Sequence, residues 1–380
     1  MKMKKNKKVD IITFQCAHNY GAILQVYALQ QTIEKMHKKV EIINYKNKII
    51  ERQYKVINVD RKNLKNFLKS IVSDILFFQK RYKRYQNFEK FIKERLNLTK
   101  IYKSEEALKN EPPIADVYIT GSDQVWNSNI TYGLQDAYTL NFGKKNIKRI
   151  SYAASIGNSK ISDNEKEIYK EKISIINNIS VREESGKKAL EQIIYSPIEV
   201  VLDPTLLLTK KQWENEIKTL TGNKEKYILA YVVEKDEQYI KIVNNLSEKT
   251  GLKIIHFGKT NPGYKNVLKS AYTEGPLEFI NYIKNAEYVV ATSFHATVFS
   301  VIFHKKFFII PHKKTGSRVT NLLDKLGIEN RTFNTLEEFK NIDYNFGTNW
   351  DNVEERLGKE RKKSLDWLEK SINEGKDSNE

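Results

Sequence analysis

One stretch of the chain, residues 286–303, does most to limit what this sequence can fold into. Residues 288–291 (Tyr-Val-Val-Ala) are a short apolar run that predicts a strand buried on both faces of a parallel sheet. Two hydroxyl residues then precede a segment with helical apolar spacing, so His295 is expected in the first turn after a strand's carboxyl end. Open α/β sheets bind ligands there, and free backbone N–H groups favour anions. The alternative is that His295 only covers a helix start.

The same succession of strand, small polar loop and helix recurs along most of the chain. Residues 9–14 predict a first strand, residues 23–36 a helix and residues 40–45 a parallel second strand, which together form a βαβ unit. Two βα-repeating halves with a cleft between them form the simplest architecture that fits. The further strand-like runs are residues 117–120, 149–154, 179–181, 200–202, 227–233, 253–257 and 306–310.

This pattern predicts an α/β protein with two Rossmann-like domains. We expect an N-terminal domain at residues 1–205, with a basic helical insertion at about 47–110, and a C-terminal domain at residues 206–345. Residues 346–380 would form a C-terminal helix and tail.

Composition excludes several classes of protein. Cys16 is the only cysteine, so an internal disulfide and a multi-cysteine zinc site are excluded. No apolar run reaches the 18 residues that a membrane span requires. The basic N-terminus is followed by too short an apolar run for a signal peptide. We expect no metal and no cofactor, and a cytoplasmic protein, possibly peripheral at the inner face of the cell membrane.

The formal net charge of +18 points to an anionic partner. Residues 46–100 hold 16 basic and 5 acidic residues, so much of the excess lies in one segment. No nucleic-acid-binding module accompanies it, and nucleic acid is not expected as a partner. An apolar helical stripe there, followed by Lys80, Arg81, Lys83 and Arg84, can lie on an anionic membrane or bind a polyanionic acceptor. The alternative is an ordinary surface insertion packed by its apolar face.

Small polar loops follow the predicted strands of the first half. Gly121 would allow a sharp turn after residues 117–120, and Trp126 would pack beneath that turn or form a platform for a sugar ring. Arg182 stands at another strand exit, where it can grip an anion or form an ion pair with a neighbouring glutamate. The candidate acceptor and loop residues are Asn19, Tyr20, Gly21, Gly121, Ser122, Asp123, Trp126, Asn127 and Ser155.

Together these loops resemble the polysaccharide pyruvyl transferase family. The resemblance runs in order from about residue 9 to residue 331. It implies a fold like that of the GT-B glycosyltransferases, phosphoenolpyruvate as donor, and a saccharide acceptor, possibly lipid-linked, that becomes a pyruvate ketal. The product would be a cell-surface or exopolysaccharide precursor. The resemblance also implies that the first domain binds the acceptor and the second the donor. The motifs are Asn19-Tyr20-Gly21-Ala22, residues 121–127 and 151–155, Val181-Arg182-Glu183, residues 202–205 and Ser293-Phe294-His295-Ala296-Thr297.

The last of these motifs departs from the family pattern. Better-known members carry arginine two residues before the histidine and glycine after it, whereas this chain has Ser293 and Ala296. Another cation would then have to balance the donor, and Arg318 suits this because it opens a helix after residues 306–310. We assign His295 as the general acid and Arg182, Arg318, Ser293 and Thr297 to donor binding.

Two other functions fit the same residues. A glycosyltransferase of this architecture would use a nucleotide sugar, with the cationic site on its diphosphate. A non-catalytic module would bind anionic saccharide or lipid surface through residues 46–100. The donor that supports turnover distinguishes all three.

Overall fold

A computed structural model describes residues 7–57, 64–157, 160–233, 236–311, 317–344 and 347–374. The chain divides into two compact units. The first contains Met1–Tyr54, Ile92–Leu208 and Leu357–Glu380, and the second contains Lys55–Phe91 and Thr209–Arg356. The basic segment is thus divided, because most of its long helix belongs to the second unit.

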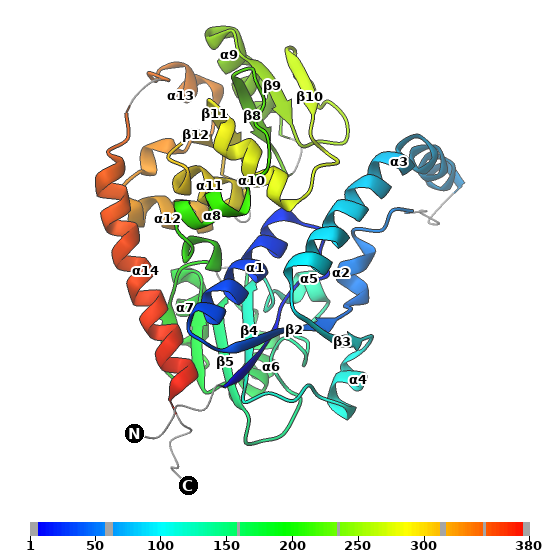
Figure 1. Ribbon diagram of the computed structural model, residues 1–380, viewed down its shortest axis with the longest axis vertical. Coiled ribbons are helices and arrows are strands. Elements are labelled where there is room, and N and C mark those ends of the chain that lie inside the picture. The colour runs from blue at the N-terminus through cyan, green and yellow to red at the C-terminus, as the bar shows by residue number, and fades with distance from the viewer. Residues whose placement is uncertain are drawn as a thin grey trace. The chain divides into compact units, whose positions relative to one another are not determined.

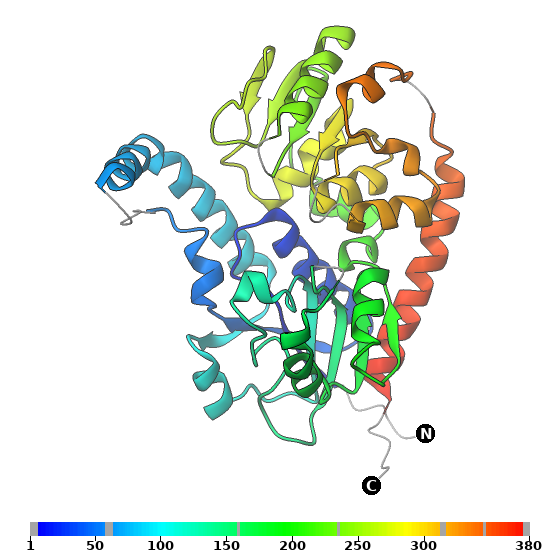
Figure 2. The ribbon, with the colours of Figure 1, turned by 180° about the vertical axis from the view of Figure 1, so that it is seen from behind.

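The first unit is built on a seven-stranded parallel sheet with strand order β3-β2-β1-β4-β5-β6-β7. Helix α1 lies over one face of this sheet and α6 over the other (Figure 1, Figure 2). Its strands are β1 (Lys8–Ile12), β2 (Lys39–Tyr45), β3 (Leu98–Tyr102), β4 (Val117–Asp123), β5 (Lys148–Ala154), β6 (Asn178–Val181) and β7 (Ile198–Val200). Its helices are α1 (Tyr20–Lys35), α2 (Lys48–Arg52), α4 (Glu105–Asn110), α5 (Ser128–Thr131), α6 (Asp163–Ile173), α7 (Glu184–Leu190) and η1 (Pro204–Leu206).

The second unit has a five-stranded parallel sheet with strand order β10-β9-β8-β11-β12. Its strands are β8 (Tyr227–Tyr231), β9 (Lys253–His256), β10 (Val267–Ser270), β11 (Tyr288–Ala291) and β12 (Lys306–Ile309). Its helices are α3 (Leu64–Arg95, in this unit up to Phe91), α8 (Lys210–Glu216), α9 (Glu237–Thr250), α10 (Pro276–Asn285), α11 (Phe294–Ile302), α12 (Ser317–Leu326), η2 (Glu329–Arg331) and α13 (Leu336–Lys340). Helix α14 (Trp350–Asn373) begins here and belongs to the first unit from Leu357 onward.

The predicted class of two Rossmann-like α/β units is confirmed by these two parallel sheets. The apolar strands are buried on both faces, as in β11, where every residue is buried. In each sheet the strand that comes first in the chain, β1 or β8, lies beside a strand reached by a long crossover, β4 or β11. These two positions are the topological switch points at which open α/β sheets bind ligands.

Two details differ from the sequence prediction. Gly121 does not begin a turn, because β4 continues through it to Asp123. A Cβ at Gly121 would lie 3.0 Å from Leu29 Cδ2 and 3.3 Å from Ile11 Cγ2, so glycine is needed there for close packing of α1. The short strands β3 and β10 were not predicted, because both carry exposed residues and lack a continuous apolar run.

Among the described residues, no helix is both long and apolar enough to cross a bilayer. The predicted long helix in the basic segment is present as α3, which has 32 residues.

Asp10 is an unusual residue for the middle of the first sheet. Its side chain is fully buried in β1, and among the described residues neither carboxylate oxygen has a hydrogen-bond partner. Lys8 Nζ lies 3.5 Å from Asp10 Oδ1 but only 2.6 Å from Glu41 Oε2. Burial, only partly opposed by Lys8, raises the pKa of Asp10 to about 7.

We expect Asp10 to make the protein less stable as pH rises. The folded-state pKa exceeds the unfolded value, so the folded state binds this proton more tightly, and its contribution to stability disappears between about pH 4 and pH 7. The loss amounts to roughly 3–4 kcal/mol. Asp10→Asn should remove this part of the pH dependence and raise the free energy of unfolding at pH 8. Urea unfolding of both proteins at pH 5 and pH 8 measures it, and identical pH dependence would refute the assignment.

Candidate functional site

Three strand ends of the first unit meet at the carboxyl edge of its sheet around one buried carboxylate, that of Asp203. Asp203 Oδ2 accepts hydrogen bonds from Ser122 Oγ (3.0 Å) and Arg182 Nη1 (3.0 Å). Asp203 Oδ1 accepts from the backbone N–H (3.0 Å) and hydroxyl (2.6 Å) of Thr205. The side chain of Asp203 is fully buried. Four donors therefore converge on one carboxylate, which ties the ends of β4, β6 and β7 together.

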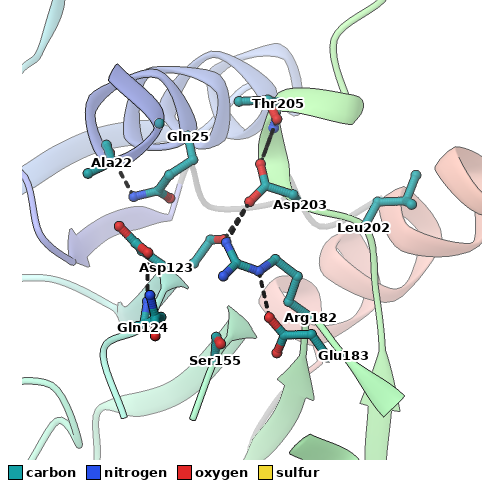
Figure 3. Close-up of polar contacts among 12 residues, drawn as sticks. Ala22, Gln25, Asp123, Gln124, Ser155, Arg182, Glu183, Leu202, Asp203 and Thr205 are labelled. Carbon is teal, nitrogen blue, oxygen red and sulfur yellow. Dashed lines mark hydrogen bonds and ion pairs between the residues drawn. The ribbon is translucent and has the colours of Figure 1, made fainter. Parts of the chain in front are cut away.

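Arg182 lies between two carboxylates (Figure 3). Its Nε donates to Glu183 Oε1 at 3.0 Å, its Nη1 donates to Asp203, and its side chain is 2% exposed. Burial by itself lowers the pKa of Arg182. The carboxylates of Glu183, Asp203 and Asp123 together raise this pKa by more than burial lowers it, so the net pKa lies above its usual value.

The contacts of Arg182 favour a structural role, and its predicted role in donor binding stays a prediction. The alternative considered from the sequence, an ion pair with a neighbouring glutamate, is present, and a second pair with Asp203 accompanies it. A guanidinium flanked by two carboxylates offers little net positive charge to an incoming anion. In this structure Arg182 thus organises the sheet edge.

The switch point of the first sheet adds polar groups to this edge. Thr13 Oγ1 donates to the Ser122 carbonyl (2.8 Å) and accepts from Gln25 Nε2 (3.1 Å), which links the end of β1 to β4 and α1. Among the described residues, the buried oxygens Gln15 Oε1 and Gln25 Oε1 have no hydrogen-bond partner. Two buried amide oxygens at this switch point, one in the loop after β1 and one in α1, thus have unused hydrogen-bonding capacity within the described part of the chain.

The backbone is strained at the same edge. Asp123, the last residue of β4, has φ +77°, and Ala153, the second-last residue of β5, has φ +52°. Non-glycine residues seldom adopt such angles, and they cluster at functional sites where surrounding contacts hold them. Here the Asp123 carbonyl accepts from Ser155 N (2.9 Å) and Ala153 N donates to Ser180 Oγ (3.2 Å).

The remaining loop candidates of the first unit mostly serve the structure. Asn19 is the N-cap of α1, and its side chain accepts from Gly21 N and Ala22 N, while Tyr20 is buried. Trp126 is fully buried and its indole N–H donates to the Tyr138 carbonyl, so it packs beneath the loop and does not form a sugar platform. The polar residues beside it are also internally bonded: Asn127 to Gln124 and Asn129, and Ser155 to Gly157.

In the second unit, His295 lies at the switch point between β8 and β11, as predicted. It is the second residue of α11 and is 8% exposed, with the Phe294 ring packed edge-on against it at 5.2 Å. The preceding Thr292 Oγ1 accepts from Val233 N (3.1 Å), which holds the β8 and β11 loops together. The switch point of the second sheet therefore presents an imidazole at the positive end of a nine-residue helix.

The two hydroxyl residues assigned to donor binding, Ser293 and Thr297, lie at the start of α11 in different surroundings. Ser293 occupies the N-cap position of α11, but its side chain makes no capping hydrogen bond. Thr297 is fully buried, and its hydroxyl donates to the Ser293 carbonyl at 3.0 Å. Burial and that bond keep the hydroxyl inside the helix, and its role in donor binding stays a prediction.

Arg318 is in the first turn of α12, the helix that follows β12, and is partly buried. Because β12 neighbours β11 in the parallel sheet, the loops before α11 and α12 leave the same edge. Residues 312–316, which include Lys313 and Lys314 and the predicted loop before Arg318, lie outside the described residues.

Several residues at these edges were not singled out from the sequence. Asp203, Thr13 and Gln25 form the network of the first sheet, and His256 ends β9 in the second. His256 Nδ1 accepts a hydrogen bond from Gly258 N at 3.1 Å. Burial, and to a smaller extent the positive charge of Lys80, lower the pKa of His256, which favours the neutral imidazole. A polar residue at the end of each apolar strand was the available signal for Asp203 and His256; Gln25 lies inside a helix and had none.

A separate hollow of about 270 Å³ lies in the second unit. It is lined by the outer residues of α10, including Glu278, Asn281 and Asn285, and by the loop at residues 220–223. Its lining contains neither His295 nor Arg318, so it is distinct from the strand-end site. Among the described residues, no cluster of three or more histidine, cysteine or acidic side chains could hold a metal ion.

The Asp203 network makes a direct prediction about stability. Asp203→Asn removes one charge of a buried pair, so it should lower the free energy of unfolding by roughly 3–5 kcal/mol. Glu184→Gln alters an exposed carboxylate one residue beyond Glu183 and should change it by less than about 0.5 kcal/mol. Urea unfolding of the two variants and the wild type provides the comparison. Equal stability of all three would show that the network contributes nothing.

Comparison with curated proteins finds no relative that matches this chain. Among solved structures, the chain is similar to the UDP-GlcNAc 2-epimerase of Methanocaldococcus jannaschii in complex with UDP-GlcNAc and UDP, at 16% identity and TM-score 0.49, covering 92% of this chain and 98% of that one. It is also similar to a Streptomyces sp. SF2575 glycosyltransferase, SsfS6, complexed with thymidine diphosphate, at 11% identity and TM-score 0.44, covering 94% and 96%.

A third similarity is to the Escherichia coli heptosyltransferase WaaC with ADP, at 10% identity and TM-score 0.37, covering 80% of this chain and 87% of that one. These three similarities carry no argument about activity. The family profile described as polysaccharide pyruvyl transferase matches residues 19–314, more than three quarters of the sequence; Thr13 and Gln15 precede the match and Arg318 follows it. The chain belongs to the polysaccharide pyruvyl transferase family.

Proposed function

We propose that this protein moves the pyruvyl group of phosphoenolpyruvate onto a sugar of a cell-surface or exopolysaccharide precursor, as a ketal, with His295 as the general acid. The observation that carries the proposal is the position of His295 at the switch point of the second sheet, within a chain of this family. A histidine in that position can reach a bound ligand, and histidine is the side chain that most often acts as a general acid or base in enzymes.

The reaction proceeds in two additions. Protonated His295 gives its proton to the methylene carbon of phosphoenolpyruvate, which becomes a methyl group and leaves an oxocarbenium-like centre on the neighbouring carbon. A saccharide hydroxyl attacks that carbon and loses its proton. A second hydroxyl then attacks the same carbon and loses its proton to the departing phosphate, as the bond between that carbon and the phosphate oxygen breaks. Positioned general acid catalysis of this kind contributes about 10²–10⁴ in rate.

The donor carries roughly three negative charges, and most of them require cationic or N–H partners in a partly dehydrated site. Arg182 is already matched by Glu183 and Asp203, which makes it a poor partner. Arg318 and the first N–H groups of α11 and α12 lie at the same carboxyl edge of the second sheet as His295, because both helices follow neighbouring parallel strands. This supports donor binding in the second unit, with Arg318 in the place of the arginine that Ser293 replaces.

The acceptor side of the proposal rests on the first unit. A saccharide presents hydroxyl donors, and the two buried amide oxygens of Gln15 and Gln25 lack partners among the described residues. Neutral acceptors at a switch point suit an uncharged sugar ring better than they suit phosphoenolpyruvate.

One assay separates the candidate functions. Purified protein is incubated with phosphoenolpyruvate and a mixture of saccharides carrying free hydroxyl pairs, and phosphate release is measured. Phosphate release that depends on the saccharide supports pyruvyl transfer. Release of nucleoside diphosphate from a nucleotide sugar alone would favour a glycosyltransferase, and no turnover with any donor would favour a binding module.

His295→Asn and His295→Ala should lower the rate of phosphate release by about 10²–10⁴ while leaving the melting temperature nearly unchanged, because the residue lies at a helix start and outside the sheet. His304→Asn, in the same unit, is the control and should retain activity, since His304 pairs with Glu354. Either His295 variant retaining more than a tenth of the wild-type rate would exclude the general acid role.

Arg318→Ala should weaken phosphoenolpyruvate binding by about 10-fold or more, the value of a charge-assisted hydrogen bond of 1.5–3 kcal/mol. Arg318→Lys should also bind the donor more weakly, with the acceptor KM unchanged, because a point charge cannot reproduce a two-pronged contact. Lys325→Gln, in the last turn of the same helix, is the control. Donor titration by calorimetry measures all three, and an unaltered Kd in Arg318→Ala would mean that other groups hold the anion.

A further inference from the structure

The long helix α3 leaves an apolar surface exposed. Ile75 is 73% exposed, Leu76 68% and Val72 56%, whereas Asp74 and Phe88 on the other side are buried. At 100° per residue the exposed residues fall within an arc of roughly 160° on one side of the helix. We call this the α3 apolar face: Val72, Ile75, Leu76, Phe78 and Tyr82.

Aromatic stacking and lysines complete this face. The rings of Phe78 and Tyr82 stack at 5.8 Å with an interplanar angle of 4°, although both are more than 40% exposed. Lys83 and Lys90 lie within the same arc and Lys80 at its margin, and all three are exposed. The whole helix has nine basic and three acidic residues. A contiguous apolar patch with a basic rim marks an interaction site.

The opposite side of α3 is anchored within the second unit. Arg84 Nη1 donates to the Tyr272 carbonyl (3.0 Å), and its guanidinium lies 4.6 Å from the Phe88 ring centroid. Arg81 pairs with Asp74 and donates to the Val56 carbonyl (3.2 Å). These two arginines therefore hold the helix, and only Lys80 and Lys83 of the four basic residues noted in the sequence are exposed.

We infer that the α3 apolar face docks on an anionic lipid membrane. Val72, Ile75 and Leu76 would enter the interface between headgroups and acyl chains, and Lys80, Lys83 and Lys90 would meet the lipid phosphates. Charge selects this occupant over a second copy of the chain, because two α3 helices packed face to face would bring their lysines together. Together with the proposed function, docking implies a lipid-linked saccharide as the acceptor.

Vesicle binding tests the inference without any assay of activity. We expect the wild-type protein to sediment with vesicles of phosphatidylglycerol and phosphatidylcholine in equal amounts, and far less with phosphatidylcholine alone. Binding should weaken with added salt. Lys80→Gln/Lys83→Gln/Lys90→Gln should reduce affinity roughly 100-fold, about fivefold per lysine. Ile75→Ser/Leu76→Ser should reduce it at least about 10-fold, with the circular dichroism spectrum unchanged.

The control removes the same charge from other helices. Lys170, Lys188 and Lys362 are exposed lysines of α6, α7 and α14, and their triple glutamine variant should bind nearly as well as wild type. An equal loss in this control would attribute binding to net charge and overturn the inference. So would vesicle binding that the α3 variants leave intact. A shift from dimer to monomer in Ile75→Ser/Leu76→Ser, without loss of vesicle binding, would assign the face to a second copy.

A failure of the proposed pyruvyl transfer can be distinguished from a failure of membrane docking. Pyruvyl transfer to a water-soluble saccharide is measured without vesicles, so its absence counts against phosphoenolpyruvate chemistry only. Transfer to a lipid-linked acceptor in vesicles that the α3 variants lose, together with unchanged transfer to the soluble acceptor, would support both.

Discussion

The buried ion pair between Arg182 and Asp203 is the interaction on which the first unit depends. Two charges withdrawn from water are costly unless every remaining hydrogen-bonding position is filled. Ser122 and Thr205 fill the positions on Asp203, and Glu183 accepts from Arg182 Nε; these three residues come from three different strand ends. Each of these loops must therefore keep its conformation for the others to keep theirs. These mutual hydrogen bonds at the sheet edge also stabilise the strained backbone conformations of Asp123 and Ala153.

The two units differ in the charged and polar groups at the carboxyl edges of their sheets. The sheet edge of the first unit holds a cation that is already neutralised, together with uncharged acceptor oxygens at its switch point. The sheet edge of the second unit holds His295 at the start of α11 and Arg318 at the start of α12. Under the proposed function, the first environment would bind the saccharide and the second the polyanionic donor. Residues that share a family motif thus need not share a chemical role.

Sequence periodicity was sufficient for the central strands β8 and β11, because each is an uninterrupted apolar run, but it missed the edge strands β3 and β10, whose residues are partly exposed. It could not assign Arg182, since an arginine at a strand exit looks the same whether its partners are carboxylates or a ligand. Asp203 is 21 residues further along the chain, and only parallel pairing of β6 with β7 brings the two side chains within 3.0 Å. The same limit applies to Thr297, whose sequence position did not reveal its bond to the Ser293 carbonyl.

Transfer of the pyruvyl carbons themselves is the most direct test of the central claim, which is that His295 protonates phosphoenolpyruvate for ketal formation. The measurement is mass spectrometry of the saccharide after incubation with carbon-labelled phosphoenolpyruvate and either wild-type protein or His295→Asn. Pyruvyl transfer predicts a labelled product heavier than the acceptor by pyruvate less one water, formed by the wild type alone. An unlabelled saccharide in the presence of active, folded protein, or equal labelling by His295→Asn, would contradict it.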